Sequence, residues 1–118
     1  MKAIALALLL FTGSVQANVI RFLYIEASEG NASGGHVALQ IGEDAYHYQY
    51  EAGMVRLFKH NAEAFRVNYR LRQNRTLHIA DIALSQATYD QINNHFKVAL
   101  LSQNQNLKQL KAMENNLA

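Results

Sequence analysis

The sequence of 118 residues contains no cysteine, no proline and no tryptophan. Without cysteine, the chain cannot form a disulfide framework, a cysteine zinc site or a cysteine nucleophile of its own. Charged residues are scarce as well, at 17% of the sequence, and the formal net charge is only +2. Phosphate binding needs a concentrated basic face, which so small an excess does not provide, and we therefore exclude nucleic acid as a partner.

Residues 1–17 have the pattern of a secretory signal peptide. Lys2 supplies a positive start, residues 3–11 are apolar, and residues 12–17 are small or polar and end in Ala17. The apolar run of about nine residues is half of the roughly twenty that a membrane span needs, so we expect no transmembrane segment. We predict cleavage after Ala17 and an exported protein, periplasmic or secreted, whose single domain covers residues 18–118.

In the rest of the chain, apolar and polar residues first alternate, as in strands, and then recur at the spacing of a helix. The predicted strands are residues 19–26, 36–41, 45–51, 54–59 and 76–84. Asn61 is a suitable N-cap for a short helix that ends near Leu71. Ser85 is a suitable N-cap for a long C-terminal helix, in which the polar stretch 102–106 is a candidate break. We predict an α+β fold, an antiparallel sheet of four or five strands with the long helix packed on its apolar face.

The hairpin that begins at His36 is the most informative part of the sequence. A two-residue turn at Gly42 and Glu43 places the apolar residues of both strands on one face, where the tyrosines of the second strand join them. This register sets Ala38 opposite His47, so His36 lies diagonal to His47 at roughly 7 to 8 Å. The other face then carries both histidines, and we expect Gln40 and Gln49 to line a small pocket beside them.

Residues 35–42, Gly-His-Val-Ala-Leu-Gln-Ile-Gly, are followed by Tyr-His-Tyr at residues 46–48. Together they resemble the histidine hairpin of the NlpC/P60 superfamily of papain-like cysteine hydrolases. By this resemblance His36 is the catalytic base and His47 is the residue that orients it. The roles are physically sensible, because a thiol needs a neighbouring imidazole to become a thiolate and that imidazole needs a partner to fix its tautomer. The resemblance implies a cell-wall peptide or an acyl compound as substrate.

The order of the elements is similar to the permuted, lecithin:retinol acyltransferase-like branch, in which the cysteine follows the histidine hairpin. No cysteine follows here, so we expect no activity from the chain alone. The chain is then either the front piece of a longer permuted enzyme or a domain that has lost the chemistry. Three serines are alternative nucleophiles, although a hydroxyl beside a lone histidine is a much poorer one: Ser28, Ser33 and Ser85.

The remaining polar residues are expected to be structural or solvated. This holds for His60 in a turn, His78 on a strand and His95 on a helix. The same reading applies to the four arginines Arg66, Arg70, Arg72 and Arg75. Glu26 and Glu29 flank the loop before His36, but no metal-ligand spacing such as HExxH accompanies them, so we predict no metal and no cofactor.

A non-enzymatic interaction module is the alternative function. The apolar stripe of the C-terminal helix continues through four leucines, Leu100, Leu107, Leu110 and Leu117. A helix over residues 85–115 spans roughly 45 Å, well beyond strands of six or seven residues. The excess stripe needs a protein partner, which is a second copy, another protein or the remainder of the domain.

Overall fold

The computed structural model of the chain describes residues 18–27 and 34–117. Its strands are β1 (Asn18–Ile25), β2 (His36–Ile41), β3 (Asp44–Glu51), β4 (Met54–Asn61) and β5 (Leu77–Leu84). Its helical segments are α1 (Ala62–Val67), which runs on into the π-helical turn η1 (Asn68–Arg72), and α2 (Gln86–Leu117).

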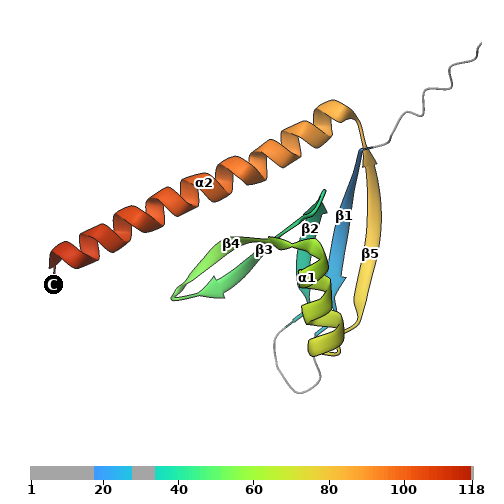
Figure 1. The fold of residues 1–118 in the computed structure, drawn as a ribbon, viewed down its shortest axis with the longest axis horizontal. Coiled ribbons are helices and arrows are strands. Elements are labelled where there is room, and N and C mark those ends of the chain that lie inside the picture. The colour runs from blue at the N-terminus through green and yellow to red at the C-terminus, as the bar shows by residue number, and fades with distance from the viewer. Residues whose placement is uncertain (1–17, 28–33, 118) are drawn as a thin grey trace, which may run out of the picture.

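The five strands form one antiparallel sheet in the order β4-β3-β2-β1-β5. Strands β1 to β4 follow one another across the sheet, and α1 with η1 then carries the chain back so that β5 pairs with β1 (Figure 1). The predicted α+β fold, with its short helix and its long C-terminal helix, is confirmed.

The turn between β2 and β3 has the predicted register. Gly42 has φ +60, and Glu43 is not among the described residues of positive φ. This combination fits a type II′ turn, whose first central position favours glycine. Ala38 pairs with His47, as the two-residue turn requires. The hairpin therefore presents both histidines on the same face of the sheet.

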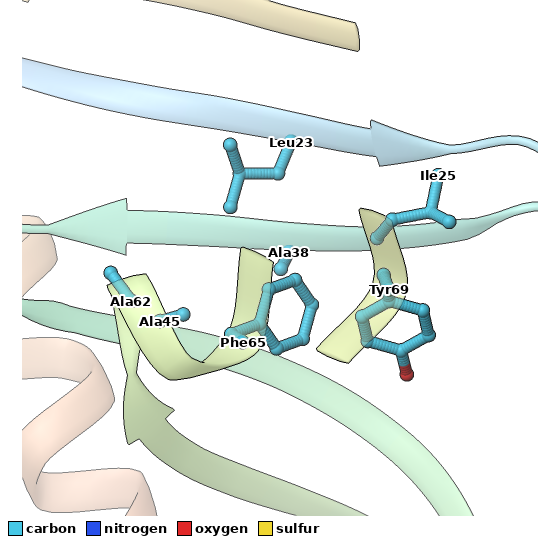
Figure 2. Packing of buried hydrophobic residues seen from close by; sticks show 7 residues of the cluster. All are labelled: Leu23, Ile25, Ala38, Ala45, Ala62, Phe65 and Tyr69. Carbon is cyan, nitrogen blue, oxygen red and sulfur yellow. The ribbon is translucent and has the colours of Figure 1, made fainter. Parts of the chain in front are cut away.

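The histidine-bearing face is covered by α1 and η1, which enclose the larger of the two clusters of buried residues. Asn61 caps α1 as predicted, since its Oδ1 accepts from the backbone N–H groups of Glu63 and Ala64, each at 3.1 Å. Figure 2 shows seven buried side chains between this helical segment and the strands, Leu23, Ile25, Ala38, Ala45, Ala62, Phe65 and Tyr69. Burial of these side chains fixes the helical segment over the centre of the sheet.

The opposite face is covered in part by α2. Ser85 caps this helix, because its Oγ accepts from the backbone N–H of Thr88 at 3.2 Å. The expected break at residues 102–106 is wrong, since α2 is continuous. One polar residue of that stretch, Gln103, is held by two hydrogen bonds to the backbone of Leu57, so it stabilises the helix position instead of ending the helix.

α2 packs on the apolar face as predicted, but it covers only part of that face. Tyr46 is 2% exposed and stacks on Phe96 of α2 with ring centroids 5.1 Å apart. Val37, Tyr48 and Tyr50 are 44%, 53% and 76% exposed. The helix runs obliquely to the strands from the end of β5, and its C-terminal part extends past the tip of the β3–β4 hairpin (Figure 1). Because the helix is straight and oblique to the strands, it covers Tyr46 and leaves Tyr48 and Tyr50 exposed.

The two edges of the sheet are formed by β4 and β5. On β4, the side-chain amide of Gln103 forms hydrogen bonds with the outward-facing backbone N–H and carbonyl of Leu57. Within residues 18–27 and 34–117, no strand pairs with the outer side of β5, which carries Ile79 and Ile82 at 50% and 44% exposure. The β4 edge is therefore hydrogen-bonded to α2 near its centre, whereas the β5 edge has no neighbouring strand among the described residues.

Candidate functional site

Three histidines from three neighbouring strands are joined by consecutive hydrogen bonds. Nε2 of His36 on β2 lies 2.9 Å from Nδ1 of His47 on β3. Nε2 of His47 lies 2.7 Å from Nδ1 of His60 on β4. The predicted pair, His36 and His47, is brought together, and the rings are closer than the strand spacing alone suggests, with centroids 5.0 Å apart.

His60 is the member that the sequence interpretation missed. It was expected in a turn, but β4 runs two residues further than predicted and ends at Asn61. Phe58 on β4 pairs with His47, and His60 lies two residues further along β4, on the same face of the sheet. On β2, Ala38 pairs with His47, and His36 lies two residues from Ala38, again on that face. The two-residue turn at residues 52–53 carried the signal, because it continues the register from β3 to β4.

His47 is the central member and the most deeply buried. It is 2% exposed, and its ring lies 4.9 Å from that of Phe65 and 5.9 Å from that of Phe58. Burial, and to a lesser extent the neighbouring His36 and His60, together lower the pKa of His47 to about 4. His47 is therefore neutral at neutral pH, with both ring nitrogens engaged.

His36 is half-buried and stands at a surface opening. Its ring stacks on Tyr69 with centroids 5.6 Å apart. Burial lowers its pKa, and the positive charge of Arg75 lowers it as well. The opening has a volume of about 500 Å³, and Gly34 and Gly35 line it beside His36. Nδ1 of His36 has no hydrogen bond to any side chain in the described part of the chain. One nitrogen of His36 is therefore held from within the protein, and the other has no side-chain partner in the described residues.

The geometry allows two directions of proton donation along the histidine chain. In one, His36 donates to His47, His47 donates to His60, and Nδ1 of His36 is an unprotonated acceptor. In the other, every donor and acceptor is reversed, and Nδ1 of His36 carries a hydrogen. A proton accepted at Nδ1 of His36 can thus be matched by release from Nε2 of His60. Such a chain of imidazoles can accept a proton at one end and release one at the other.

The far end of the histidine chain reaches a second cavity. This cavity has a volume of about 280 Å³ and is lined by His60, His47, Phe65 and Asn68, among others. It is large enough to hold water, and polar groups line part of it. The histidine chain therefore joins the opening at His36 to a separate cavity at His60.

The two glutamines behave differently from the expectation that both line one pocket. Gln49 lines both cavities and donates from Nε2 to the hydroxyl of Tyr69 at 3.3 Å. Gln40 turns away, because its Nε2 donates to the carbonyl of Gly42 at 3.1 Å and its Oε1 accepts from Arg66. The prediction for Gln40 is wrong because its amide satisfies the hairpin turn.

The remaining histidines lie outside the chain of three. His78 forms an ion pair with Glu26 at 2.7 Å, and both side chains are about half-exposed. His95 is exposed on α2. Within residues 18–27 and 34–117, no group of three histidine or acidic side chains has an arrangement that could hold a metal ion.

Ser85 is too far from His36 to serve as its nucleophile. Ile25 pairs with both His36 and Leu77, so His36 lies level with the start of β5. Ser85 follows the other end of that strand, eight residues away, or about 27 Å at the usual rise per residue. Its hydroxyl is also engaged in capping α2. The other two candidates, Ser28 and Ser33, and the acidic residue Glu29 lie outside the described residues.

The predicted signal peptide, residues 1–17, also lies outside the described residues. Among the helices that are described, none combines the length and the apolar character needed to cross a bilayer.

Comparison with protein-family models, with curated proteins and with solved structures finds no match to this chain.

Proposed function

We propose that this exported chain supplies the histidine half of a thiol-dependent acyl-transfer site of the NlpC/P60 type. In this proposal His36 is the general base, His47 orients it, and the thiol comes from polypeptide outside the 118 residues. The substrate is an amide or ester of a cell-wall peptide or another acyl compound, as the resemblance of residues 35–48 implies.

One observation carries the proposal, the hydrogen bond of 2.9 Å between Nε2 of His36 and Nδ1 of His47. It ties down one nitrogen of His36 and leaves the other at an opening bordered by Gly34 and Gly35. Glycine has no side chain, so a reacting group can approach the imidazole closely. A neutral imidazole held in one orientation is the partner that a thiol needs to react near neutral pH.

The proposed reaction has two stages, transfer of the acyl group to the thiol and then cleavage of the thioester. The S–H bond breaks, its proton passes to Nδ1 of His36, and the thiolate adds to the carbonyl carbon. The amine or alcohol then leaves with the proton held by His36, and a thioester remains. Water or another acceptor cleaves the thioester and restores the thiol. The 118 residues contain no cysteine, so we expect no such turnover from them alone.

The test introduces a thiol at the opening by the substitution Gly34→Cys. A side chain at Gly34 meets no atom within 4 Å, so the substitution leaves the packing intact. If His36 activates thiols there, iodoacetamide should alkylate the new thiol about tenfold faster near pH 6 than the same thiol in a His36→Gln background. The rate is followed by intact-mass measurement across a series of pH values.

Gln105→Cys is the matched control, because residue 105 is exposed on α2 and far along the chain from His36. Its alkylation should follow an ordinary thiol pKa of about 8.5 and should not respond to His36→Gln. Equal alkylation of Gly34→Cys with and without His36 would overturn the proposal.

An interaction module is the second candidate function, and the exposed stripe of α2 favours it. Leu110, Met113 and Leu117 are 46%, 61% and 88% exposed on the part of the helix beyond Gln103. We take a second copy of the chain as the partner to test, by sedimentation equilibrium of the wild type and of a Leu110→Gln, Met113→Gln variant. Self-association that the two substitutions abolish supports this candidate, and a wild type that stays monomeric contradicts it. Truncation before Gln103 is unsuitable, because it would also remove the two hydrogen bonds between Gln103 and Leu57 of β4.

A further inference from the structure

We propose that Arg75 forms a subsite for a carboxylate group at the opening beside His36. The inference rests on the proposed function in so far as the ligand is a substrate, and it adds that this substrate is an anion. It is supported by the fixed position of the guanidinium, by its lack of an acidic partner and by the shape of the opening.

The guanidinium of Arg75 is held in place by backbone and aromatic contacts. Its Nε donates to the backbone carbonyl of Glu26 at 2.7 Å. Its Cζ lies 5.3 Å from the ring centroid of Tyr69, the same ring on which His36 stacks. Nη1 has a long contact of 3.5 Å to Gln73, and Nη2 donates to no other group in the described part of the chain. A planar donor group is thus oriented while part of its donor capacity remains free.

Arg75 is not paired with an acid among the described residues. Glu26, whose carbonyl accepts from Arg75, directs its own carboxylate to His78 at 2.7 Å. The other ion pair in the described residues joins Arg21 to Asp81 at 2.7 Å. A guanidinium that is fixed, half-buried and without a counter-ion favours a negatively charged ligand.

None of the described residues that line the opening is acidic. The opening has a volume of about 500 Å³, and Arg75 is the charged side chain among its described lining residues. On the same face, Arg56 pairs across the strands with Gln49, and its buried Nε has no partner in the described residues. Elsewhere on this face, Asp81 is paired with Arg21, and Glu51 lies at the end of β3, outside the described lining of the opening. Arg75 at the opening, with Arg56 on the same face, therefore favours an anionic ligand there.

The effect of Arg75 on His36 shows that the two groups share one electrostatic environment. After burial, the charge of Arg75 is the second cause that lowers the pKa of His36. A carboxylate bound at Arg75 would offset that charge and raise the pKa of His36. The bound ligand would therefore tune the base that the proposed reaction uses.

The experiment compares two ligands that differ only in charge. N-acetyl-alanine and N-acetyl-alaninamide are titrated into the wild-type chain, and the backbone amide signals of Gly34 and Gly35 are followed by NMR. A carboxylate that binds a fixed guanidinium gains a charge-assisted hydrogen bond, so we expect the acid to bind roughly tenfold more tightly than the amide. Equal affinity for the two ligands would overturn the proposal.

Variants locate the binding on the protein. Arg75→Gln should weaken acid binding to the level of the amide, whereas Arg72→Gln, at an exposed arginine outside the opening, should leave it unchanged. If Arg75→Gln lowers stability, Arg75→Lys keeps the charge and should retain part of the preference for the acid. Unchanged acid binding in a folded Arg75→Gln protein would also overturn the proposal.

The ligand titration and the alkylation experiment test the two proposals independently. Ligand binding needs no thiol, whereas the alkylation of Gly34→Cys needs no carboxylate. A failure of either measurement therefore leaves the other interpretable.

Discussion

The side-chain amide of Gln103 binds both backbone groups of Leu57, accepting from its N–H at 2.8 Å and donating to its carbonyl at 2.9 Å. Leu57 lies on β4, where outward-facing backbone groups lack a neighbouring strand. Gln103 takes the place of that strand at one residue. The pair fixes the point at which α2 crosses the edge of the sheet.

Removal of the contact between Gln103 and Leu57 should lower the stability of the protein more than an ordinary substitution on the surface of a helix does. Gln103→Ala loses two half-buried hydrogen bonds, so we expect the free energy of unfolding in urea to fall by about 1 to 2 kcal/mol. Gln105→Ala, an exposed neighbour on the same helix, should change it by less than about 0.5 kcal/mol. Hydrogen exchange at the Leu57 amide should accelerate only in the first variant. Equal losses in both would show that the contact has no special role.

Acid should destabilise the protein through His47. The pKa of His47 is about 4 in the folded chain and 6.5 in an ordinary environment, so the unfolded chain binds a proton first as the pH falls. Stability from this group is complete above about pH 6.5 and is lost progressively down to about pH 4, by at most about 3 kcal/mol. The lowered pKa of His36 acts in the same direction.

The measurement is urea unfolding at about pH 7.5 and about pH 4.5 for the wild type and for His47→Gln. Glutamine cannot take up the proton, so the variant should lose less stability between the two pH values than the wild type does. Parallel losses in both proteins would contradict the burial of a neutral His47.

His60 should matter more to stability than the exposed histidine on β5. His60→Phe leaves Nε2 of buried His47 without its partner, which we expect to cost about 1 to 2 kcal/mol in free energy of unfolding. His78→Phe removes a half-exposed ion pair with Glu26 and should cost less than about 1 kcal/mol. Calorimetry or urea unfolding provides the comparison, and the reverse order would argue against the chain of three histidines.

Gly35 should be intolerant of a side chain for a reason that lies in Tyr24. A Cβ at Gly35 would come within 2.5 Å of the Tyr24 ring, whereas a Cβ at Gly34 meets nothing within 4 Å. We expect Gly35→Ala to cost about 1 kcal/mol, because Tyr24 must swing from its stack on His78, and Gly34→Ala to be nearly neutral. In a Tyr24→Ala background the cost of Gly35→Ala should vanish. A cost that persists there would place the constraint in the backbone.

Short-range patterns in the sequence predict the fold and half of the site. The turn at Gly42 sets the register of His36 and His47, and Asn61 caps its helix through groups two and three residues away. Such features depend on a few adjacent residues, so they can be predicted without knowledge of the whole chain.

The parts that escaped prediction depend on distant contacts. The path of α2 is set by Gln103 and Leu57, which are 46 residues apart, and that path decides which tyrosines remain exposed. The turn at residues 52–53 sets the face on which His60 lies, but it does not set the length of β4. The strand continues to Asn61, and the backbone N–H of Ala62 then bonds to the carbonyl of Glu43. Arg75 has a role in the opening only because β5 returns beside β1.

The difference between the two edges of the sheet limits how many copies of the chain can associate by pairing their β5 strands. Strand addition can begin at the open side of β5, whereas β4 is occupied at Leu57. Two copies joined through β5 would bury both open edges and present only their β4 edges outward. A third copy would find no equivalent edge, so pairing by this route is self-terminating and ends in a closed, two-fold symmetric sheet instead of a fibre.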